Sequence, residues 1–114
     1  MTIIKFEDII SWQKAKLLVL EIYKIFRGNH DLSFKDQIQR ASVSIMNNIA
    51  EGFERKGDRE FKHFLYIAKG SCGELRSMLH VARELRYLTN KDFENLYNLS
   101  LEISKLLSGF TKTL

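Results

Sequence analysis

The chain has 114 residues, a length that suits one domain able to bury a hydrophobic core. Hydrophobic residues make up 45% of it and charged residues 28%, a balance that is ordinary for a globular protein and excludes a disordered chain. The formal charge is +4, and the surplus of cations lies in residues 55–91, which hold nine Lys/Arg against four Asp/Glu. Such a local surplus indicates an anionic partner.

Cysteine content and the first residues bear on the compartment. Cys72 is the only cysteine, so no internal disulfide can form, and its inward position in a predicted helix favours a small core residue. Residues 1–10 lack the layout of a signal peptide, and no apolar run approaches the ~20 residues of a membrane span. We therefore expect a cytoplasmic protein with no membrane partner.

Two helices are predicted in the first half of the chain, where the absence of proline lets helices run unbroken. The first covers about residues 8–26, and its core stripe contains Ala15, Leu18, Ile22 and Ile25. The second covers about 33–55, and its stripe contains Ile38, Ala41, Ile45, Ile49 and Phe53. Ser33 with Asp36 resembles a capping box at the start of this second helix.

The third predicted helix, about residues 58–87 with Asp58 as its cap, carries two different faces. Its heptads begin at Phe61, and apolar residues fill most a, d, e and g positions, an arc wider than one bundle core needs. The b positions are all basic, namely Lys62, Lys69, Arg76 and Arg83. The wide arc predicts a subunit partner. The cations predict a polyanion, and a solvated outer face is the alternative interpretation. Gly70 and Gly73 predict close contacts with a neighbouring backbone, within the bundle or between subunits.

The fourth helix starts at a cap formed by Thr89 and Asp92. Its predicted core residues are Leu96, Leu99, Ile103, Leu106 and Phe110. All connections between the helices are short, which makes consecutive helices antiparallel. The predicted fold is all-α: one domain, residues 1–114, forming an antiparallel up-down-up-down four-helix bundle.

Several sequence blocks resemble one known family. Phe6-Glu7-Asp8 with Trp12-Gln13-Lys14-Ala15 is the first block. Gln37–Ala41, Ser44-Ile45 and Asn48-Ile49-Ala50-Glu51-Gly52-Phe53 make the second. Arg55, Phe61, Phe64–Ser71 and Glu74-Leu75 make the third. Together they are similar to the bacterial four-helix-bundle family of proteins encoded in intervening sequences of 23S rRNA genes. The accessory variability protein of diversity-generating retroelements looks like a relative.

The resemblance implies a fold and, more loosely, an activity. It implies an antiparallel bundle that assembles into a homopentameric ring and has no enzymatic activity. It also implies nucleic-acid binding, which among the retroelement relatives is accompanied by contact with a reverse transcriptase. One residue departs from the family pattern, because Met46 stands where proline usually follows Ser-Ile, so the middle of the second helix should be more regular.

The candidate site is the basic face of the third helix together with the residues before it. We expect RNA or DNA to contact Arg55, Lys56, Arg59, Lys62, Tyr66, Lys69, Arg76 and Arg83. The cations would follow the phosphate backbone, and Tyr66 would stack on a base. No catalytic residue, metal site or cofactor is expected.

Other interpretations stay open at this stage. The chain could be a protein-interaction scaffold whose cations serve a protein partner. It could also be a ribonuclease of the HEPN type, which needs an Arg and a His separated by four to six residues on one helix. Arg59 and His63, and likewise Arg76 and His80, have only three residues between them. Glu51 and Glu74 could form a carboxylate pair, but a structural polar network with Asn48 and Ser71 explains them better. A lone Glu60-x-x-His63 motif is too little for a di-iron site.

Overall fold

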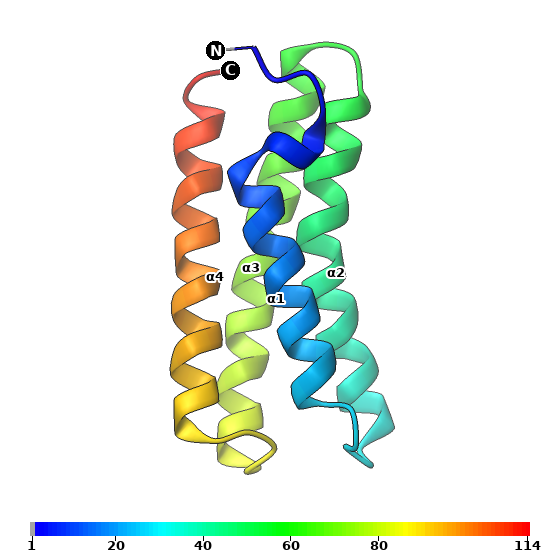
Figure 1. Cartoon of the computed structure of the whole chain (residues 1–114), viewed down its shortest axis with the longest axis vertical. Coiled ribbons are helices and arrows are strands. Elements are labelled where there is room, and N and C mark those ends of the chain that lie inside the picture. The colour runs from blue at the N-terminus through cyan, green and yellow to red at the C-terminus, as the bar shows by residue number, and fades with distance from the viewer. Residues whose placement is uncertain (1) are drawn as a thin grey trace.

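The computed structural model describes residues 2–114 as four α-helices preceded by a 3₁₀ turn, Phe6–Asp8. The helices are α1 (Ile10–Ile25), α2 (Leu32–Glu54), α3 (Asp58–Glu84) and α4 (Asn90–Thr111). Figure 1 shows the chain direction alternating from each helix to the next. The fold is therefore an antiparallel four-helix bundle, and the predicted all-α class is confirmed. None of the helices within residues 2–114 is long and apolar enough to cross a membrane.

The four helices sit at the corners of a square. α1 packs against α2 and α4, and α3 packs against the same two helices from the opposite corner. In Figure 1, α1 lies in front of α3, and the bundle extends 42 Å along its long axis. Helix α3 therefore has two flanks. We call the side with Phe64, Ser71 and Met78 the α2 flank, and the side with Lys62, Lys69, Arg76 and Arg83 the α4 flank.

The core stripe of α3 follows the predicted heptads. All four a residues are buried, and so are Leu65, Cys72 and Leu79 at the e positions. The d residues of the α2 flank are only half-buried, and Ile67 and Val81 at g positions are exposed. The bundle core thus uses the a and e positions, and part of the wide apolar arc faces outward.

Helix α4 is rotated relative to the predicted orientation. Of its predicted core residues, Leu96 and Ile103 are buried as expected, whereas Leu99, Leu106 and Phe110 are only half-buried. Ser100 and Leu107, which were not predicted, are buried instead. The change corresponds to roughly one residue, or about 100° around the helix. The buried serine is tolerated because its Oγ donates a hydrogen bond to the carbonyl of Cys72 at 3.2 Å. Its small size also lets α3 and α4 approach closely.

The helix caps match the predictions at one of three ends. Thr89 caps α4, accepting a hydrogen bond from the Asp92 backbone N–H at 3.0 Å as predicted. At α2, the cap is Asp31, whose carboxylate accepts from the Phe34 N–H, so the prediction of Ser33 is wrong. At α3, the cap is Gly57 with φ +98°, and Asp58 is the first helical residue. No side chain caps this end of α3. The turn between α2 and α3 depends instead on a backbone conformation that glycine adopts readily.

The close approach of α2 and α3 occurs at a different glycine from those predicted. A Cβ added to Gly52 would lie 2.6 Å from the Phe64 Cβ, so only glycine fits there. A Cβ on Gly70 would meet nothing within 4 Å, and one on Gly73 would meet only the Arg76 side chain at 3.9 Å. Within the bundle, the predicted close contacts of Gly70 and Gly73 are therefore wrong.

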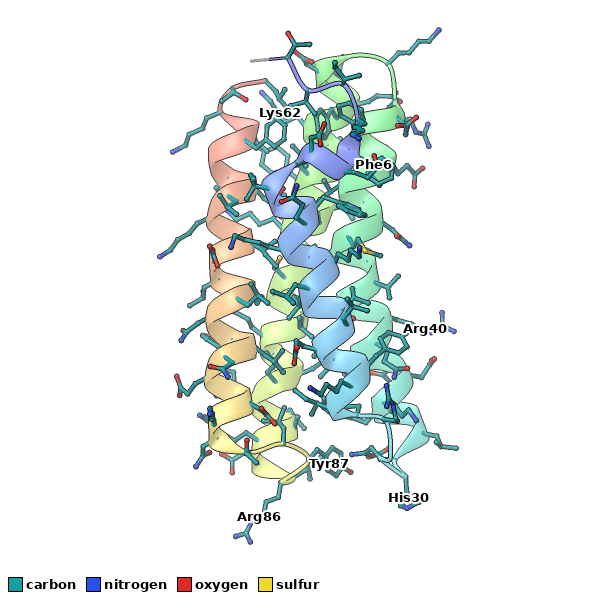
Figure 2. The ribbon with its side chains drawn as sticks, in the orientation of Figure 1. Phe6, His30, Arg40, Lys62, Arg86 and Tyr87 are labelled. Atoms are coloured by element: carbon teal, nitrogen blue, oxygen red, sulfur yellow. The ribbon has the colours of Figure 1, made fainter. Side chains whose placement is uncertain are left out.

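The end of the bundle opposite the chain termini is tied together by a contact between two connections. Arg86 adopts φ +61° after α3, and the Tyr87 N–H donates to the Ala82 carbonyl at 2.9 Å, a Schellman-type ending. The Tyr87 hydroxyl then donates to the Asp31 carboxylate at 2.6 Å. This bond lowers the pKa of Asp31 and raises that of Tyr87. Figure 2 shows Tyr87 beside the connection that carries His30, with Arg86 pointing away from the bundle.

Candidate nucleic-acid interface

The four b-position cations form one row along the α4 flank. Lys69 is exposed, and Lys62, Arg76 and Arg83 are half-buried beside α4. The row covers 21 residues, which is about 31 Å at 1.5 Å per residue. In Figure 2, Lys62 lies near the end that holds the chain termini, so the row runs most of the bundle's length. The heptad spacing places the cations on one side because seven residues are almost two helical turns.

Arg76 is held by a buried hydroxyl of α4. Its Nη1 donates to the Oγ of Ser100 at 3.2 Å, and that hydroxyl in turn donates to the Cys72 carbonyl. A guanidinium has five N–H donors, and this contact uses only one of them. The side chain is thus fixed in position while its charge and its other donors stay available.

Arg83 is held by an aromatic ring instead. Its guanidinium lies over the Phe93 ring with the central carbon 3.8 Å from the ring centroid. A guanidinium stacked in this way occupies its flat face and leaves its N–H edges free for an anion. Phe93 also stacks on Tyr97 at 5.3 Å between ring centroids, and His80 packs against both rings at the same distance.

Among residues 2–114, no Asp or Glu forms an ion pair with this row of cations. Within residues 2–114 the ion pairs are Lys14–Glu102, Arg40–Asp36 and Arg55–Glu51, and none involves the α4 flank. The sequence explains much of the contrast, because Arg40 and Arg55 each follow an acid four residues earlier, whereas Lys69, Arg76 and Arg83 have no acid three or four residues away. Lys62 does follow Asp58 by four residues, but the two side chains form no ion pair in the part of the chain that the structure describes. The α4 flank therefore keeps a net positive charge.

The other predicted contact residues lie around the start of α3. Arg55 follows the last residue of α2, paired with Glu51 at 2.7 Å and stacked over Phe64 at 5.1 Å. Lys56 in the connecting turn and Arg59 in the first turn of α3 are exposed. Tyr66 is exposed on α3. The structure thus places Lys56 and Arg59 near the Lys62 end of the row, whereas the charge of Arg55 is already compensated by Glu51.

The contribution of α4 to this surface was not predicted from the sequence. Ser100, Phe93 and Tyr97 all depend on the rotation of α4, which the overlapping apolar stripes of that helix did not reveal. Tyr97 follows Phe93 by four residues, so the two rings had to share one face of the helix. That spacing was the available signal, and His80 belongs to the same group.

The carboxylate pair, polar network and metal site considered from the sequence can each be compared with the structure. Ser44 and Ser71 join α2 to α3 through a hydroxyl contact of 2.9 Å, and the Asn48 side-chain amide donates to both the carbonyl and the hydroxyl of Ser44. Glu51 pairs with Arg55, whereas Glu74 is exposed. The counter-ion of Glu51 is thus Arg55, which follows it by four residues. Among residues 2–114, no three His, Cys, Asp or Glu side chains gather as a metal site would require.

Fold and surface together define a small antiparallel bundle with one basic, aromatic face along α3 and α4. The model of the 23S rRNA-intervening sequence protein family matches residues 7–109. The chain therefore belongs to that family, which confirms the resemblance seen in its motifs. It is also similar to the crystal structure of a protein of unknown function from the S23 ribosomal protein family of Bacteroides thetaiotaomicron VPI-5482. The two share 27% identity and a TM-score of 0.84, over 90% of this chain and 99% of that one. No curated protein matches significantly.

Proposed function

We propose that this protein is a non-catalytic, oligomeric nucleic-acid-binding protein of the cytoplasm that holds a phosphate backbone along the α4 flank. The observation that carries the proposal is the row of four cations without a carboxylate partner. Two of them, Arg76 and Arg83, are fixed by a hydroxyl and a ring that leave their charge intact. A cation that binds phosphate should be held in place and yet have no carboxylate partner, since a carboxylate would compete with the phosphate.

The test is a salt titration of binding to RNA and DNA. Replacing Lys62, Lys69, Arg76 and Arg83 with alanine should weaken binding and lower the slope of log K against log salt by roughly one unit per lost phosphate contact. The matched control removes four exposed cations from the opposite side, Lys5, Lys16, Lys24 and Arg27, and changes the net charge equally. An equal loss of affinity in both variants would mean that only the net charge matters and would refute a site on the α4 flank. Unchanged binding by the first variant would refute the proposal.

We propose further that the protein assembles with copies of itself, with five subunits as the number that the family resemblance implies. Two exposed apolar stripes support assembly, and they lie at opposite corners of the bundle. One is on α1 with Ile10, Leu17 and Leu20, and the other is on α3 with Ile67, Val81 and Leu85. Different patches on opposite sides fit head-to-tail contacts, which close into a ring when the rotation per subunit allows it. The α3 stripe and the row of cations occupy different sides of that helix.

Light scattering after gel filtration tests the assembly. The parent should have the mass of a multiple of its 13.4 kDa chain, and Leu20→Glu or Val81→Glu should shift it toward the monomer. Asn47→Glu, a change at an exposed position on the outer side of α2 and outside both stripes, is the control and should leave the mass distribution unchanged. A monodisperse monomer of the parent at micromolar concentration would refute assembly.

A scaffold that docks another protein is the second candidate function, and the same exposed apolar stripes favour it. The salt titration separates the two, because a scaffold would bind neither RNA nor DNA. The same samples report on a ribonuclease, since gel analysis would show whether the RNA is recovered intact. Cleavage lost in His80→Ala would favour the enzyme.

A further inference from the structure

One group of side chains on the α4 flank has a chemistry that phosphate contacts do not require. His80 is exposed, and its ring lies 5.3 Å from the rings of both Phe93 and Tyr97. Phe93 is buried beneath this group, and Tyr97 is half-buried. The His80 and Tyr97 rings meet at 74°, so they form a corner of two aromatic surfaces where α3 and α4 meet.

Cations flank this corner on both sides along α3. Arg76 precedes His80 by four residues and Arg83 follows it by three, so each lies about one helical turn away. Arg76 is anchored to Ser100, and Arg83 rests on Phe93, the ring that also supports His80 and Tyr97. A fixed cation, an aromatic corner and a second fixed cation therefore follow one another over about 10 Å.

Phosphates of a duplex would be served by the cations alone. An aromatic corner adds binding energy only for a base that is free to leave its own stack. In a duplex the bases are stacked inside, and the phosphates and sugars lie outside. In proteins that bind single strands, a positive groove follows the backbone and aromatic side chains stack with the unpaired bases. The α4 flank combines both elements.

We propose that His80 and Tyr97 form a stacking site for one unpaired base, with Arg76 and Arg83 holding the adjoining phosphates. The protein then prefers single-stranded RNA or DNA to duplex. This inference rests on the proposed function and narrows its ligand class. It also moves the stacking position away from Tyr66, which lies 14 residues, or about 21 Å along α3, from His80.

Anisotropy titrations with fluorescein-labelled 20-mers test the preference. The three probes are one mixed sequence as single-stranded DNA, as single-stranded RNA and as duplex DNA. Tyr97→Leu and His80→Leu should each weaken single-strand binding by about 5- to 150-fold, the range expected for one lost stacking contact, and duplex binding by less than about twofold. Tyr97→Phe and His80→Phe keep a ring and should stay within about threefold of the parent.

Photochemical cross-linking locates the base in the unmodified protein and does not depend on how well a variant folds. A single-stranded 20-mer carrying 5-iodouracil is irradiated in the complex, and the modified tryptic peptide is identified by mass spectrometry. We expect the cross-link in residues 92–105, which contain Tyr97, or in residues 77–83, which contain His80. A cross-link confined to residues 63–69 would assign the base to Tyr66 and overturn the inference.

The outcomes separate this inference from the proposed function. Salt-dependent binding that needs the row of cations, but treats single strands and duplex alike and ignores the leucine variants, keeps the function and refutes the stacking site. Absence of binding to all three probes refutes both. Equal binding of single-stranded RNA and DNA, both tighter than duplex, supports the stacking site and means that it contacts only the base and the phosphates. A preference for RNA alone would add a contact to the 2′-hydroxyl within the same site.

Discussion

The two flanks of α3 use similar residues in opposite ways. Beside the α2 flank, the cations Arg40 and Arg55 lie next to acids of their own helix, and hydroxyls bond to each other, as Ser44 and Ser71 do. On the α4 flank, cations pair with neutral groups, a serine hydroxyl and a phenyl ring. The difference shows that a cation can be fixed in place without being neutralised. The first arrangement stabilises a surface, and the second prepares one for an anion.

The largest expected effect concerns the inner wall of the α4 flank, where Cys72 lies behind the cations. Burial raises the pKa of this thiol from 9.0 to about 11, although the nearby Arg76 opposes the shift. The native thiol should therefore react with Ellman's reagent at pH 8 on the order of 100-fold more slowly than the unfolded chain. Because its folded pKa is the higher one, the thiol's contribution to stability is complete below about pH 9 and is lost as pH rises toward 11. Equally fast labelling of native and unfolded protein would show that water reaches this wall.

Two glycines sharpen the contrast between the tight contact of α2 with α3 and the open side of α3. Gly52→Ala should lower the free energy of unfolding by about 1–3 kcal/mol, because its Cβ would clash with the Phe64 Cβ near the backbone. Gly70→Ala should raise it by up to about 1 kcal/mol, since the site is open and alanine favours helix. Urea unfolding of both variants measures this. A loss of stability in Gly70→Ala would point to a neighbour that closes on α3 in the assembly.

A pair of serine variants tests whether a hydroxyl matters for stability or for charge placement. Ser44→Ala and Ser100→Ala should each cost about 1–2 kcal/mol of stability, because each hydroxyl makes two hydrogen bonds and the typical net value of one is about 1 kcal/mol. Only Ser100→Ala should also weaken nucleic-acid binding, by roughly two- to fivefold, because Arg76 loses its anchor. Melting curves and anisotropy titrations on the same samples give both values. Equal binding by the two variants would remove the distinction between the flanks.

The smallest expected effect lies at the paired cation. Glu51→Gln breaks the exposed pair with Arg55 and should move the unfolding midpoint by no more than about 2 °C, because such pairs contribute little. Nucleic-acid binding should stay the same or rise slightly, since Arg55 regains a free charge beside Lys56 and Arg59. A clear loss of binding would mean that the carboxylate itself positions the ligand.

The sequence predicted α3 well because its heptads admit one answer. The residues Phe61, Ala68, Leu75 and Ala82 had to be buried, and the b cations then had to share a side. Helix α4 was harder, because Leu96, Ile103 and Leu107 form one apolar stripe while Leu99, Leu106 and Phe110 form another. Which stripe enters the core depends on whether α3 can satisfy buried serines, and that is tertiary information. The anchor of Arg76 and the aromatic corner were missed for this reason.

The hydrogen bond from Tyr87 to Asp31 joins two connections that are 56 residues apart along the chain. Separating the α1–α2 hairpin from the α3–α4 hairpin at this end requires this bond to break, so the two hairpins should fray together there. Amide protons of the adjoining turns should exchange with solvent only through that shared opening. The bond thus couples the local unfolding of one hairpin to that of the other.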